Sequence, residues 1–327
     1  MRDIIDIEFH SSVWGQASIS ALSQALTLRE LPSSFLYKGA YSACLWERLH
    51  LAHAPSCQEE AEVSLHARGI HCLAKHLPNS MFQLVALGCG LAEKESLFLG
   101  QLGDRIERVG LVDVSVELVC EAKRRLIAMQ PGLEVDGTVA DLSQLVRWND
   151  LIKEVGTAPR VMTLFGMVPN FDPRFLFERL SALMRPGDWL LLDANLIPDS
   201  TAGDESVPGS ILSQYDNKEC RQWLMASLSE LGIYESSGRL VFSADLVEAG
   251  FPLPRIRADF EFEENVSIAI ASEDQTFKRG ESLSVFHSIR YGRETLPMLL
   301  RRAGFETIES WFSASGEDGV FLCRKAS

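Results

Sequence analysis

The sequence predicts an α/β protein built on a parallel, doubly wound sheet. From Phe82 onward, short apolar runs of the kind that form buried strands alternate with amphipathic helical stretches. The connections between them are only a few residues long, and the first apolar run ends in Gly88-Cys89-Gly90 directly before a helical stretch. Strand–helix alternation with short loops is typical of a parallel sheet covered by helices on both faces.

A helical region precedes this alternation. Apolar residues recur at helical spacing over residues 16–31, 34–52 and 59–76, and the breaks between these stretches contain Pro32 and Pro55. We therefore expect three helices ahead of the first strand of the sheet.

The predicted core has five strands and four helices in alternation. The strands are expected at residues 84–87, 109–112, 135–139, 161–165 and 189–193. The helices are expected at residues 93–102, 116–129, 142–155 and 175–184. Pro-Gly pairs at Pro131 and Pro186 end two of these helices before the next strand.

The alternation stops after Ile197. A polar loop follows at 198–210, then a helix at 211–231, strand-like segments at 255–272 and 282–291, a helix at 296–303 and a strand at 319–324. We expect residues 61–198 and 290–327 to form the α/β core. Residues 1–60 and 199–289 are expected to form a mixed α+β lid over the carboxyl edge of the sheet, where ligands bind in such folds.

The composition excludes several classes of function. With a formal net charge of −14, neither nucleic acid nor an anionic membrane is expected as a partner, because both need a positive surface. The seven cysteines form no CxxC pair and His66, His71 and His76 do not share one helix face, so we expect no metal site. The N-terminus lacks the apolar segment of a signal peptide and no apolar run approaches 18 residues, which predicts a cytoplasmic protein.

Residues at the strand ends predict a nucleoside pocket. Gly88 and Gly90 let the backbone turn sharply and approach a ligand, and Cys89 lies between them. Asp113 ends the next strand, where a carboxylate accepts hydrogen bonds from both ribose hydroxyls. Asp141 follows the third strand, where it is expected to accept a hydrogen bond from an adenine amine, to cap a helix, or to do both.

Two further residues belong to this predicted pocket. Leu142 is expected to pack near the base, and Ser115 stands where it can also cap the helix that starts at Val116. A dinucleotide fits poorly, because Glu93 replaces the third glycine of the usual motif and, with Glu95, would repel a pyrophosphate. S-adenosylmethionine (SAM) carries no phosphate, so these residues favour a SAM-dependent methyltransferase over an NAD-dependent dehydrogenase.

The ordered set of motifs resembles a known family. It comprises the methyltransferases that trimethylate the α-amino group of histidine in ergothioneine synthesis, and related fungal enzymes that N-methylate a prenylated tryptophan. LPSSFLYK, ALGCGLAEKE, GLVDVS, ADL, LFGMVPNFDP, RPGDWLLLDANL, QYDN and FHSIRY resemble family motifs in the same order, from about Leu31 onward. The resemblance implies a Rossmann-like class I methyltransferase core with a lid.

The resemblance also implies roles for matching residues. Gly88, Lys94, Asp113, Asp141 and Leu142 would contact the cofactor. Tyr37, Asn170 and Tyr215 would hold the α-amino and carboxylate groups of an amino acid, which suits their hydrogen-bonding capacity.

The substrate side-chain positions depart from the family. Phe286 stands where the family has a glutamate that grips imidazole, Ala54 stands where it has a tyrosine, and only Ser288 keeps the family's serine. A buried polar group that loses a hydrogen-bond partner costs about 1–3 kcal/mol. We therefore expect N-methylation of a free amino acid or small amino-acid derivative other than histidine.

No general base is predicted, because a tyrosine, an asparagine carbonyl or water can each accept the proton of the amine. Asn170 and Tyr215 are assigned to orientation of the substrate. Two alternatives stay open: methylation of oxygen or carbon on another small metabolite, and a SAM-binding protein without catalysis.

Overall fold

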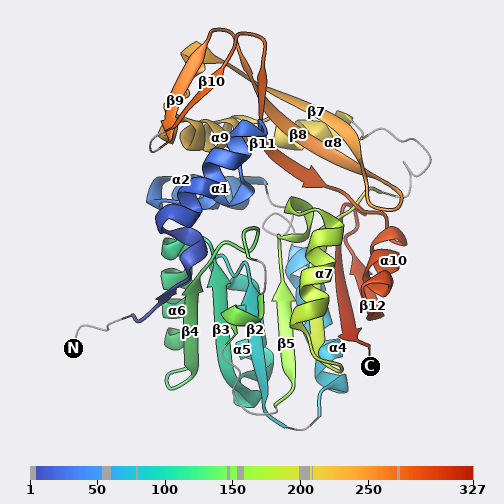
Figure 1. The fold of residues 1–327 in the computed structure, drawn as a ribbon. Helices are drawn as coiled ribbons and strands as arrows, with labels where there is room; N and C mark the ends of the chain where they lie inside the picture. Colours follow the sequence, from blue (N-terminus) through green and yellow to red (C-terminus); the bar gives the residue numbers. More distant parts are fainter. Residues whose placement is uncertain are drawn as a thin grey trace.

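The computed structural model describes residues 5–53, 60–78, 80–145, 148–152, 158–198, 207, 209–270 and 273–326. Within these residues, a central sheet of eight strands has the order β1-β4-β3-β2-β5-β6-β13-β12 (Figure 1). The strands are β1 (Glu8–Phe9), β2 (Phe82–Leu87), β3 (Ile106–Asp113), β4 (Glu134–Val139), β5 (Arg160–Leu164), β6 (Trp189–Asn195), β12 (Phe305–Phe312) and β13 (Asp318–Lys325).

Strands β1 to β6 of this sheet run parallel, and only β13 and β12 pair antiparallel. The strand order reverses between β2 and β5, which are neighbours in the sheet but not in the chain. Ligands bind at such a reversal, outside the carboxyl ends of the strands. The predicted doubly wound fold is confirmed.

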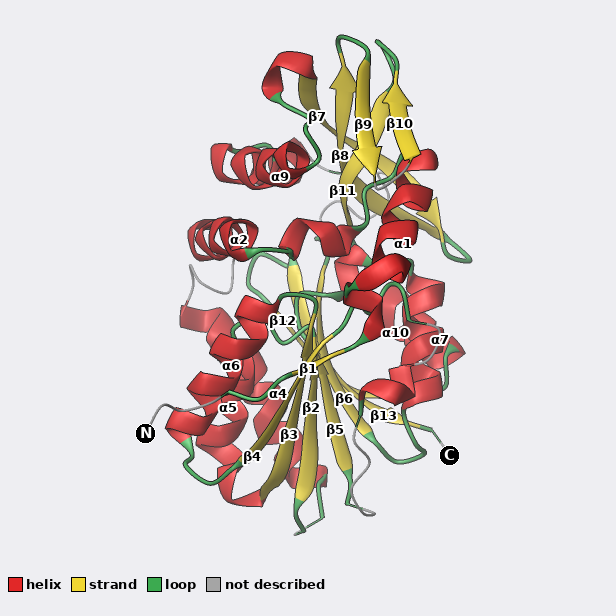
Figure 2. Ribbon diagram, turned by 60° about the vertical axis from the view of Figure 1, so that its left-hand side comes forward, coloured by secondary structure: helices red, strands yellow, loops and turns green. Residues whose placement is uncertain are grey.

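Helices cover both faces of the sheet (Figure 2). Helices α4 (Glu60–His76), α5 (Glu93–Leu102) and α6 (Val116–Met129) pack on one face, and α7 (Pro173–Leu183) and α10 (Thr295–Arg302) pack on the other. Successive strand residues such as Leu84 and Val85 enter opposite cores, as the two-residue period of a strand requires. None of the described helices is long and apolar enough to span a membrane.

One predicted core helix is wrong. The described part of residues 142–155 contains turns and the short 3₁₀ turn η4 (Trp148–Leu151) instead of an α-helix. Trp148 is 1% exposed and its Nε1 donates to the Leu142 carbonyl at 3.0 Å. The apolar residues of this segment therefore pack into the core from a compact loop. Their pattern indicated burial and did not indicate a helix. Strands β1 and β12 were not predicted either.

The lid combines the N-terminal region with the residues that follow β6 and precede α10. Its helices are α1 (Gly15–Thr27), α2 (Ala40–His53), α8 (Gly209–Tyr215) and α9 (Lys218–Glu230), with short 3₁₀ turns η1 (Ser11–Val13), η2 (Ser33–Tyr37) and η7 (Glu235–Ser237). Its strands are β7 (Gly238–Glu248), β8 (Pro252–Phe262), β9 (Val266–Ile270), β10 (Glu273–Phe277) and β11 (Ser282–Ile289). They form an antiparallel sheet β11-β8-β7 and the hairpin β9–β10.

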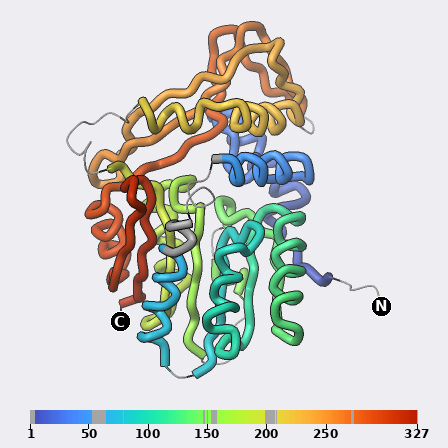
Figure 3. Tube along the Cα trace, turned by 180° about the vertical axis from the view of Figure 1, so that it is seen from behind, coloured from blue at the N-terminus to red at the C-terminus, as the bar shows by residue number. Residues whose placement is uncertain are grey.

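A separate hydrophobic core joins the two parts of the lid. Leu26, Leu36 and Leu45 from the N-terminal region pack with Trp223 and Phe260 from the later residues. Helices α2 and α9 lie side by side above the sheet (Figure 3). This shared core fixes the N-terminal helices to the later residues, and residues of η2 and α2 border the cavity at the carboxyl ends of the strands. The proposed domain boundaries at 60, 198 and 289 stay a prediction.

The helix predicted over residues 211–231 is two helices. α8 ends at Tyr215, and α9 begins after Asn217, whose Oδ1 accepts the Cys220 N–H at 2.8 Å as an N-cap. This break places Tyr215 at the end of a helix, beside the second cavity described below.

Candidate active site

Two adjoining cavities of ≈ 250 Å³ each lie between the sheet's carboxyl edge and the lid. The first cavity is bordered by the turn after β2, the ends of β3 and β4, and residues of η2 and α2. The second cavity lies between β6, β13, α9 and β11. Residues that line both cavities are Tyr37, Trp46, His50, Lys94, Gly166 and Asn170.

The glycine turn after β2 forms part of the first cavity. Gly88 has φ +70° and Gly90 has φ +49°, in the left-handed region that favours glycine. The Gly88 and Cys89 N–H groups both donate to the Val112 carbonyl, at 2.8 and 3.0 Å. A Cβ on Gly88 would lie 2.4 Å from Met167 Cγ, so the turn has no room for a side chain there.

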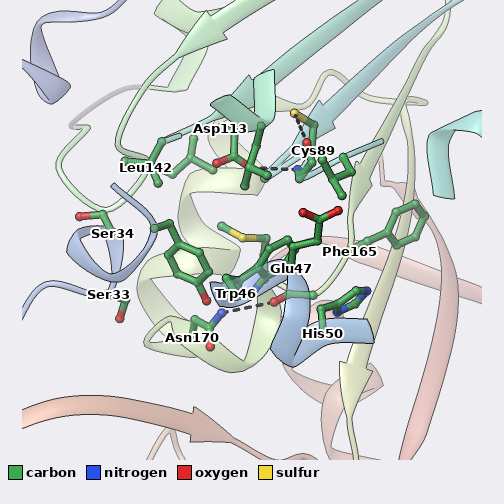
Figure 4. Close-up of a pocket in the computed structure, with 18 of the residues that line it drawn as sticks. Ser33, Ser34, Trp46, Glu47, His50, Cys89, Asp113, Leu142, Phe165 and Asn170 are labelled. Atoms are coloured by element: carbon green, nitrogen blue, oxygen red, sulfur yellow. Dashed lines mark hydrogen bonds between the residues drawn. The ribbon is translucent and has the colours of Figure 1, made fainter. Parts of the chain in front are cut away.

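Asp113 lies at the end of β3 with its carboxylate at the first cavity (Figure 4). One oxygen accepts the Gly90 N–H and the other accepts the Ser115 N–H, both at 3.0 Å. Burial raises the pKa of this carboxyl, and the backbone hydrogen bonds oppose the increase. The remaining lone pairs of a carboxylate held in this way suit the two hydroxyls of a ribose.

Ser115 does not line the first cavity. Its hydroxyl accepts the Leu118 N–H at 3.4 Å and caps α6, while its own N–H fixes Asp113. The structure therefore brings Ser115 next to the predicted cofactor residues without placing it at the cavity surface.

Asp141 and Leu142 line the far side of the first cavity. Asp141 Oδ1 accepts both the Ser143 N–H, at 3.0 Å, and the Ser143 hydroxyl, at 2.6 Å. The Asp141 N–H donates to Ser12 Oγ at 3.0 Å, which ties η1 to this corner. Since residues 142–145 are not helical, Asp141 stabilises a turn and is not the helix cap that the sequence suggested.

Lys94 lies on the boundary between the cavities. Its Nζ is 2.8 Å from Asp193 Oδ2, and His66 Nε2 is 3.0 Å from the same oxygen. The Gly166 N–H donates to the other oxygen of Asp193. Burial opposes ionisation of both partners, but Lys94 and His66 lower the pKa of Asp193 and Asp193 raises that of Lys94, so both stay charged.

Glu95 is a buried acid in the wall of the first cavity, and its burial was not predicted from the sequence. It is 3% exposed, and the Thr163 hydroxyl donates to its Oε1 at 2.6 Å. Burial raises the pKa of Glu95 to about 7, with the Thr163 hydrogen bond opposing the increase. Glu95 is therefore partly protonated at neutral pH.

An aromatic wall runs along the second cavity from its border with the first. Tyr37 lies 5.9 Å from Trp46 and 5.3 Å from Trp223, measured between ring centroids. Phe286 continues the wall, 6.0 Å from Trp223 and 5.9 Å from Tyr215. These five rings line a largely apolar space.

A polar cluster closes the end of the second cavity. Tyr215 Oη is 3.0 Å from Ser288 Oγ, and Asn195 Nδ2 donates to both oxygens, at 3.2 and 3.4 Å. Arg290 Nη2 also donates to Tyr215 Oη, at 3.4 Å. With both of its lone pairs occupied, the tyrosine hydroxyl has its proton directed at Ser288.

Asn170 and Tyr37 meet where the cavities join. Asn170 ends the short 3₁₀ turn η5 (Val168–Asn170), and its Nδ2 donates to the Gly166 carbonyl at 3.3 Å (Figure 4). Burial raises the pKa of Tyr37 far above its usual value, and a side-chain hydrogen bond with Asn170 opposes the increase. Tyr37 therefore stays a neutral phenol that can donate as well as accept.

His50 also lines both cavities and was not predicted. It stacks on Trp46, with ring centroids 5.2 Å apart, one helical turn along α2. Burial and the nearby Lys94 charge lower the pKa of His50, so its ring is neutral at pH 7. No motif marks this position, since only the docking of α2 on the sheet brings it here.

The structure brings most of the predicted site residues together. Gly88, Cys89, Gly90, Lys94, Asp113, Asp141 and Leu142 line the first cavity, and Tyr37, Asn170, Tyr215, Phe286 and Ser288 line the second. Ala54 lies outside the described residues. Among the residues that are described, no group of three or more His, Cys, Asp or Glu side chains is placed to hold a metal ion.

The chain matches the model of a family described as "Histidine-specific methyltransferase, SAM-dependent" over residues 16–202 and 252–325. Tyr215 and Trp223 fall between the two matched segments. A histidine N-alpha-methyltransferase from Mycobacterium tuberculosis (strain CDC 1551 / Oshkosh) is 23% identical over 314 residues, which cover 91% of each chain.

Solved structures match the chain only at low identity, with TM-scores below 0.5. A SAM-dependent methyltransferase from Clostridium acetobutylicum ATCC 824 is 11% identical, with a TM-score of 0.45 and coverage of 86% of this chain and 99% of that one. The PH0226 protein from Pyrococcus horikoshii OT3 is also 11% identical, with a TM-score of 0.44 and coverage of 86% and 98%. The family match spans most of the chain, and the protein therefore belongs to the histidine-specific, SAM-dependent methyltransferases.

Proposed function

We propose that this SAM-dependent methyltransferase N-methylates a free amino acid or small amino-acid derivative whose side chain is not an imidazole. The observation that carries the proposal is the joining of the two cavities at Tyr37, Asn170 and Lys94. A cofactor in the first cavity and an acceptor in the second would meet at these residues.

The first cavity fits the adenosyl part of the cofactor. Asp113 offers a carboxylate at the ribose position, Asp141 and Leu142 lie where the base is expected, and the Gly88 turn leaves no side chain in the way. Bound SAM would supply a methyl group on a positively charged sulfur. The protein's contribution is then mainly alignment of the acceptor and exclusion of water.

The second cavity supports an amino-acid acceptor. Tyr37 and Asn170 at the junction offer both donors and acceptors to an amino group. Tyr215, whose hydroxyl is held by Asn195, Arg290 and Ser288, lines the cavity farther along. The acceptor amine must lose a proton before it attacks the methyl carbon, because an ammonium has no lone pair. We assign Asn170 and Tyr215 to orientation of the acceptor.

The aromatic wall supports a side chain other than imidazole. Phe286 replaces the glutamate of the resembled family and packs between Trp223 and Tyr215. Ser288, which that family uses on imidazole, is engaged by Tyr215 and Asn195. The mycobacterial relative is named for histidine, so histidine belongs in any test as the competing acceptor.

The test is incubation of the protein with SAM and a panel of the common amino acids, including histidine, read by mass gains of one, two or three methyl groups. Methylation of one or more acceptors other than histidine supports the proposal. Methylation of histidine alone contradicts the proposal. Methylation of none of the amino acids while SAM still binds contradicts a free amino acid as the acceptor.

The alanine variant at Asn170 separates catalysis from binding. We expect N170A to lose methyl transfer while its affinity for SAM changes little. A SAM-binding protein without catalysis would be unaffected by this change. Methylation of oxygen or carbon on another metabolite remains the alternative if amines do not react.

The remaining predictions are part of the same proposal. We also propose a cytoplasmic location, and a small molecule as partner without nucleic acid or membrane. The net charge of −14 supports the second of these proposals. Cell fractionation and binding to DNA-coated or anionic-lipid surfaces test them.

A further inference from the structure

We propose that Asp318 selects the methyl acceptor by accepting a hydrogen bond from an N–H or O–H group on the acceptor's ring, at the end away from the transferred methyl. This inference rests on the proposed function and specifies its substrate: an aromatic acceptor that carries a hydrogen-bond donor. Asp318 lines the second cavity but not the first.

The side chain of Asp318 carries a buried polar atom without a partner. Its Oδ2 is the one carboxylate oxygen among the described residues that is buried and accepts no hydrogen bond. Native proteins almost always pair such atoms, so each exception calls for an explanation. Asp318 also lines the second cavity, and rotation of its carboxylate toward that cavity would present this oxygen to a donor on a bound substrate.

The backbone holds Asp318 in this place. It is the first residue of β13, its N–H donates to Ser313 Oγ at 3.2 Å, and its carbonyl accepts the Ser313 N–H at 3.0 Å. Across the sheet it pairs with Asn195 at the end of β6. Asp318 therefore belongs to the polar end of the second cavity, together with Asn195, Tyr215 and Ser288.

The other carboxylate of this cavity is already engaged. Asp193 accepts from Lys94 and His66 through one oxygen and from the Gly166 N–H through the other. It lies at the border with the cofactor cavity, where the methyl would be transferred. Asp318 is thus the carboxylate of this cavity that stays available to a bound acceptor.

Phe286 occupies the position of the family's glutamate, so the cavity lacks that hydrogen-bond acceptor. A hydrogen-bond donor on the substrate therefore needs another acceptor in the protein. Phe286 projects from β11, whereas Asp318 projects from β13, which is a strand of the central sheet. Besides Asp193, the same cavity therefore keeps a carboxylate for the substrate, presented from a different wall. The aromatic rings from Trp46 to Tyr215 would hold the body of the acceptor between the two ends.

The charges that face Asp318 come from four elements. Burial raises its pKa to about 6; Asp193 on β6 and the adjacent Glu317 add to the increase, while Arg290, which follows β11, and Lys94 on α5 oppose it. Asp318 is therefore ionised and a pure acceptor at pH 7.5. It becomes protonated as the pH falls below about 6.

The experiment measures binding of matched ligand pairs to the full chain with S-adenosylhomocysteine present, by calorimetry at pH 7.5. The pairs are tryptophan with 1-methyltryptophan and tyrosine with phenylalanine, and histidine is a fifth ligand. In each pair, only one member carries the ring donor. We expect the donor-bearing member of at least one pair to bind the wild type roughly tenfold more tightly.

The variant Asp318→Leu removes the hydrogen-bonding carboxylate and replaces it with an apolar side chain of similar size. The variant Asp318→Asn keeps the shape of the side chain but has only one acceptor oxygen. We expect D318L to lose the preference within the pair while the member without a donor binds no more weakly than to wild type. Glu306→Gln, on the exposed side of β12, is the matched control. Unchanged affinity for S-adenosylhomocysteine shows that each variant is folded.

Each other outcome is decisive. Equal binding of both members of every pair to wild type, or a preference that survives in D318L, overturns the assignment to Asp318. If none of the five ligands binds but another acceptor is methylated, the inference fails and the proposed function stands. Failure of S-adenosylhomocysteine itself to bind would instead contradict the cofactor site.

A pH series adds a second readout. Binding of the donor-bearing ligand to wild type should weaken as the pH falls below about 6, and D318L should show no such loss. Parallel pH profiles for the two proteins would contradict the role of Asp318.

Discussion

Lys94 Nζ and Asp193 Oδ2 lie 2.8 Å apart, where the first cavity meets the second. Lys94 lies in α5, the helix that follows the glycine turn. Asp193 lies in β6, on the other side of the reversal in strand order. The ion pair therefore links the two halves of the sheet at the point where cofactor and acceptor would meet.

We expect Lys94→Met to destabilise the protein by about 2–4 kcal/mol, because a largely buried Asp193 loses a cationic partner. It should also raise the pKa of His50 toward its usual value, since the Lys94 charge is one cause of its depression. Urea unfolding and NMR titration of His50 measure the two effects. Lys278→Met, at an exposed site, is the control. An unchanged His50 titration would contradict the placement of Lys94.

Gly88→Ala should weaken SAM binding at least tenfold. The new Cβ would lie 2.4 Å from Met167 Cγ, and φ +70° is strained for alanine by about 1–3 kcal/mol. Gly132→Ala is a matched control, because Gly132 also has positive φ but nothing within 4 Å of the added Cβ. Calorimetric SAM titration compares the two. Equal losses would show that backbone strain alone, and not crowding of the turn, is responsible.

Asp113→Asn should lower SAM affinity by about tenfold to a hundredfold. An amide offers one acceptor oxygen where the carboxylate now holds the Gly90 and Ser115 N–H groups and faces the cavity. Asp104→Asn, on an exposed 3₁₀ turn, should have no effect. Should Asp113→Asn bind SAM as tightly as wild type, Asp113 does not hold the ribose.

Glu95 should make the protein less stable as the pH rises. Its folded-state pKa of about 7 lies above the usual 4.5, so the unfolded chain ionises first and stability is lost from about pH 4.5 up to 7. Through Glu95, the free energy of unfolding of the wild type should fall by about 2–4 kcal/mol between pH 5 and 8. The variant Glu95→Gln should not show this fall. Urea unfolding at both pH values measures it, with the exposed Glu93→Gln as control. Parallel pH profiles for wild type and E95Q would refute it.

Glu95 should also make the number of protons released on binding differ between the cofactor SAM and the product S-adenosylhomocysteine. A bound sulfonium lowers the pKa of Glu95 by its positive charge, whereas S-adenosylhomocysteine carries no such charge. Near pH 7, SAM binding should therefore release a fraction of a proton more than product binding. Calorimetry in buffers of different ionisation enthalpy measures this difference, and E95Q should abolish it.

Local sequence was sufficient for the core elements. The helices predicted at 93–102 and 116–129 coincide with α5 and α6, because their apolar residues follow a helical period and glycine, proline or serine marks their ends. The buried strands were predicted for the same reason: a run of apolar residues too short for a helix and bounded by turns. Gly88, Asp113 and Asp141 then fell at strand ends, and a parallel sheet brings those ends to one edge.

Only the tertiary structure placed the residues that depend on contacts between distant segments. His50, Trp223 and Asp318 reach the cavities through the docking of α2, α9 and β13, which no local pattern encodes. In the loop around Trp148, a local apolar pattern predicted a helix, but the apolar residues pack into the core without one. The sequence thus determined the sheet and its glycine turn, through periodicity and backbone conformation. The folded chain decided which side chains face one another across the second cavity, because burial and pairing between segments far apart in the sequence are properties of the packed whole.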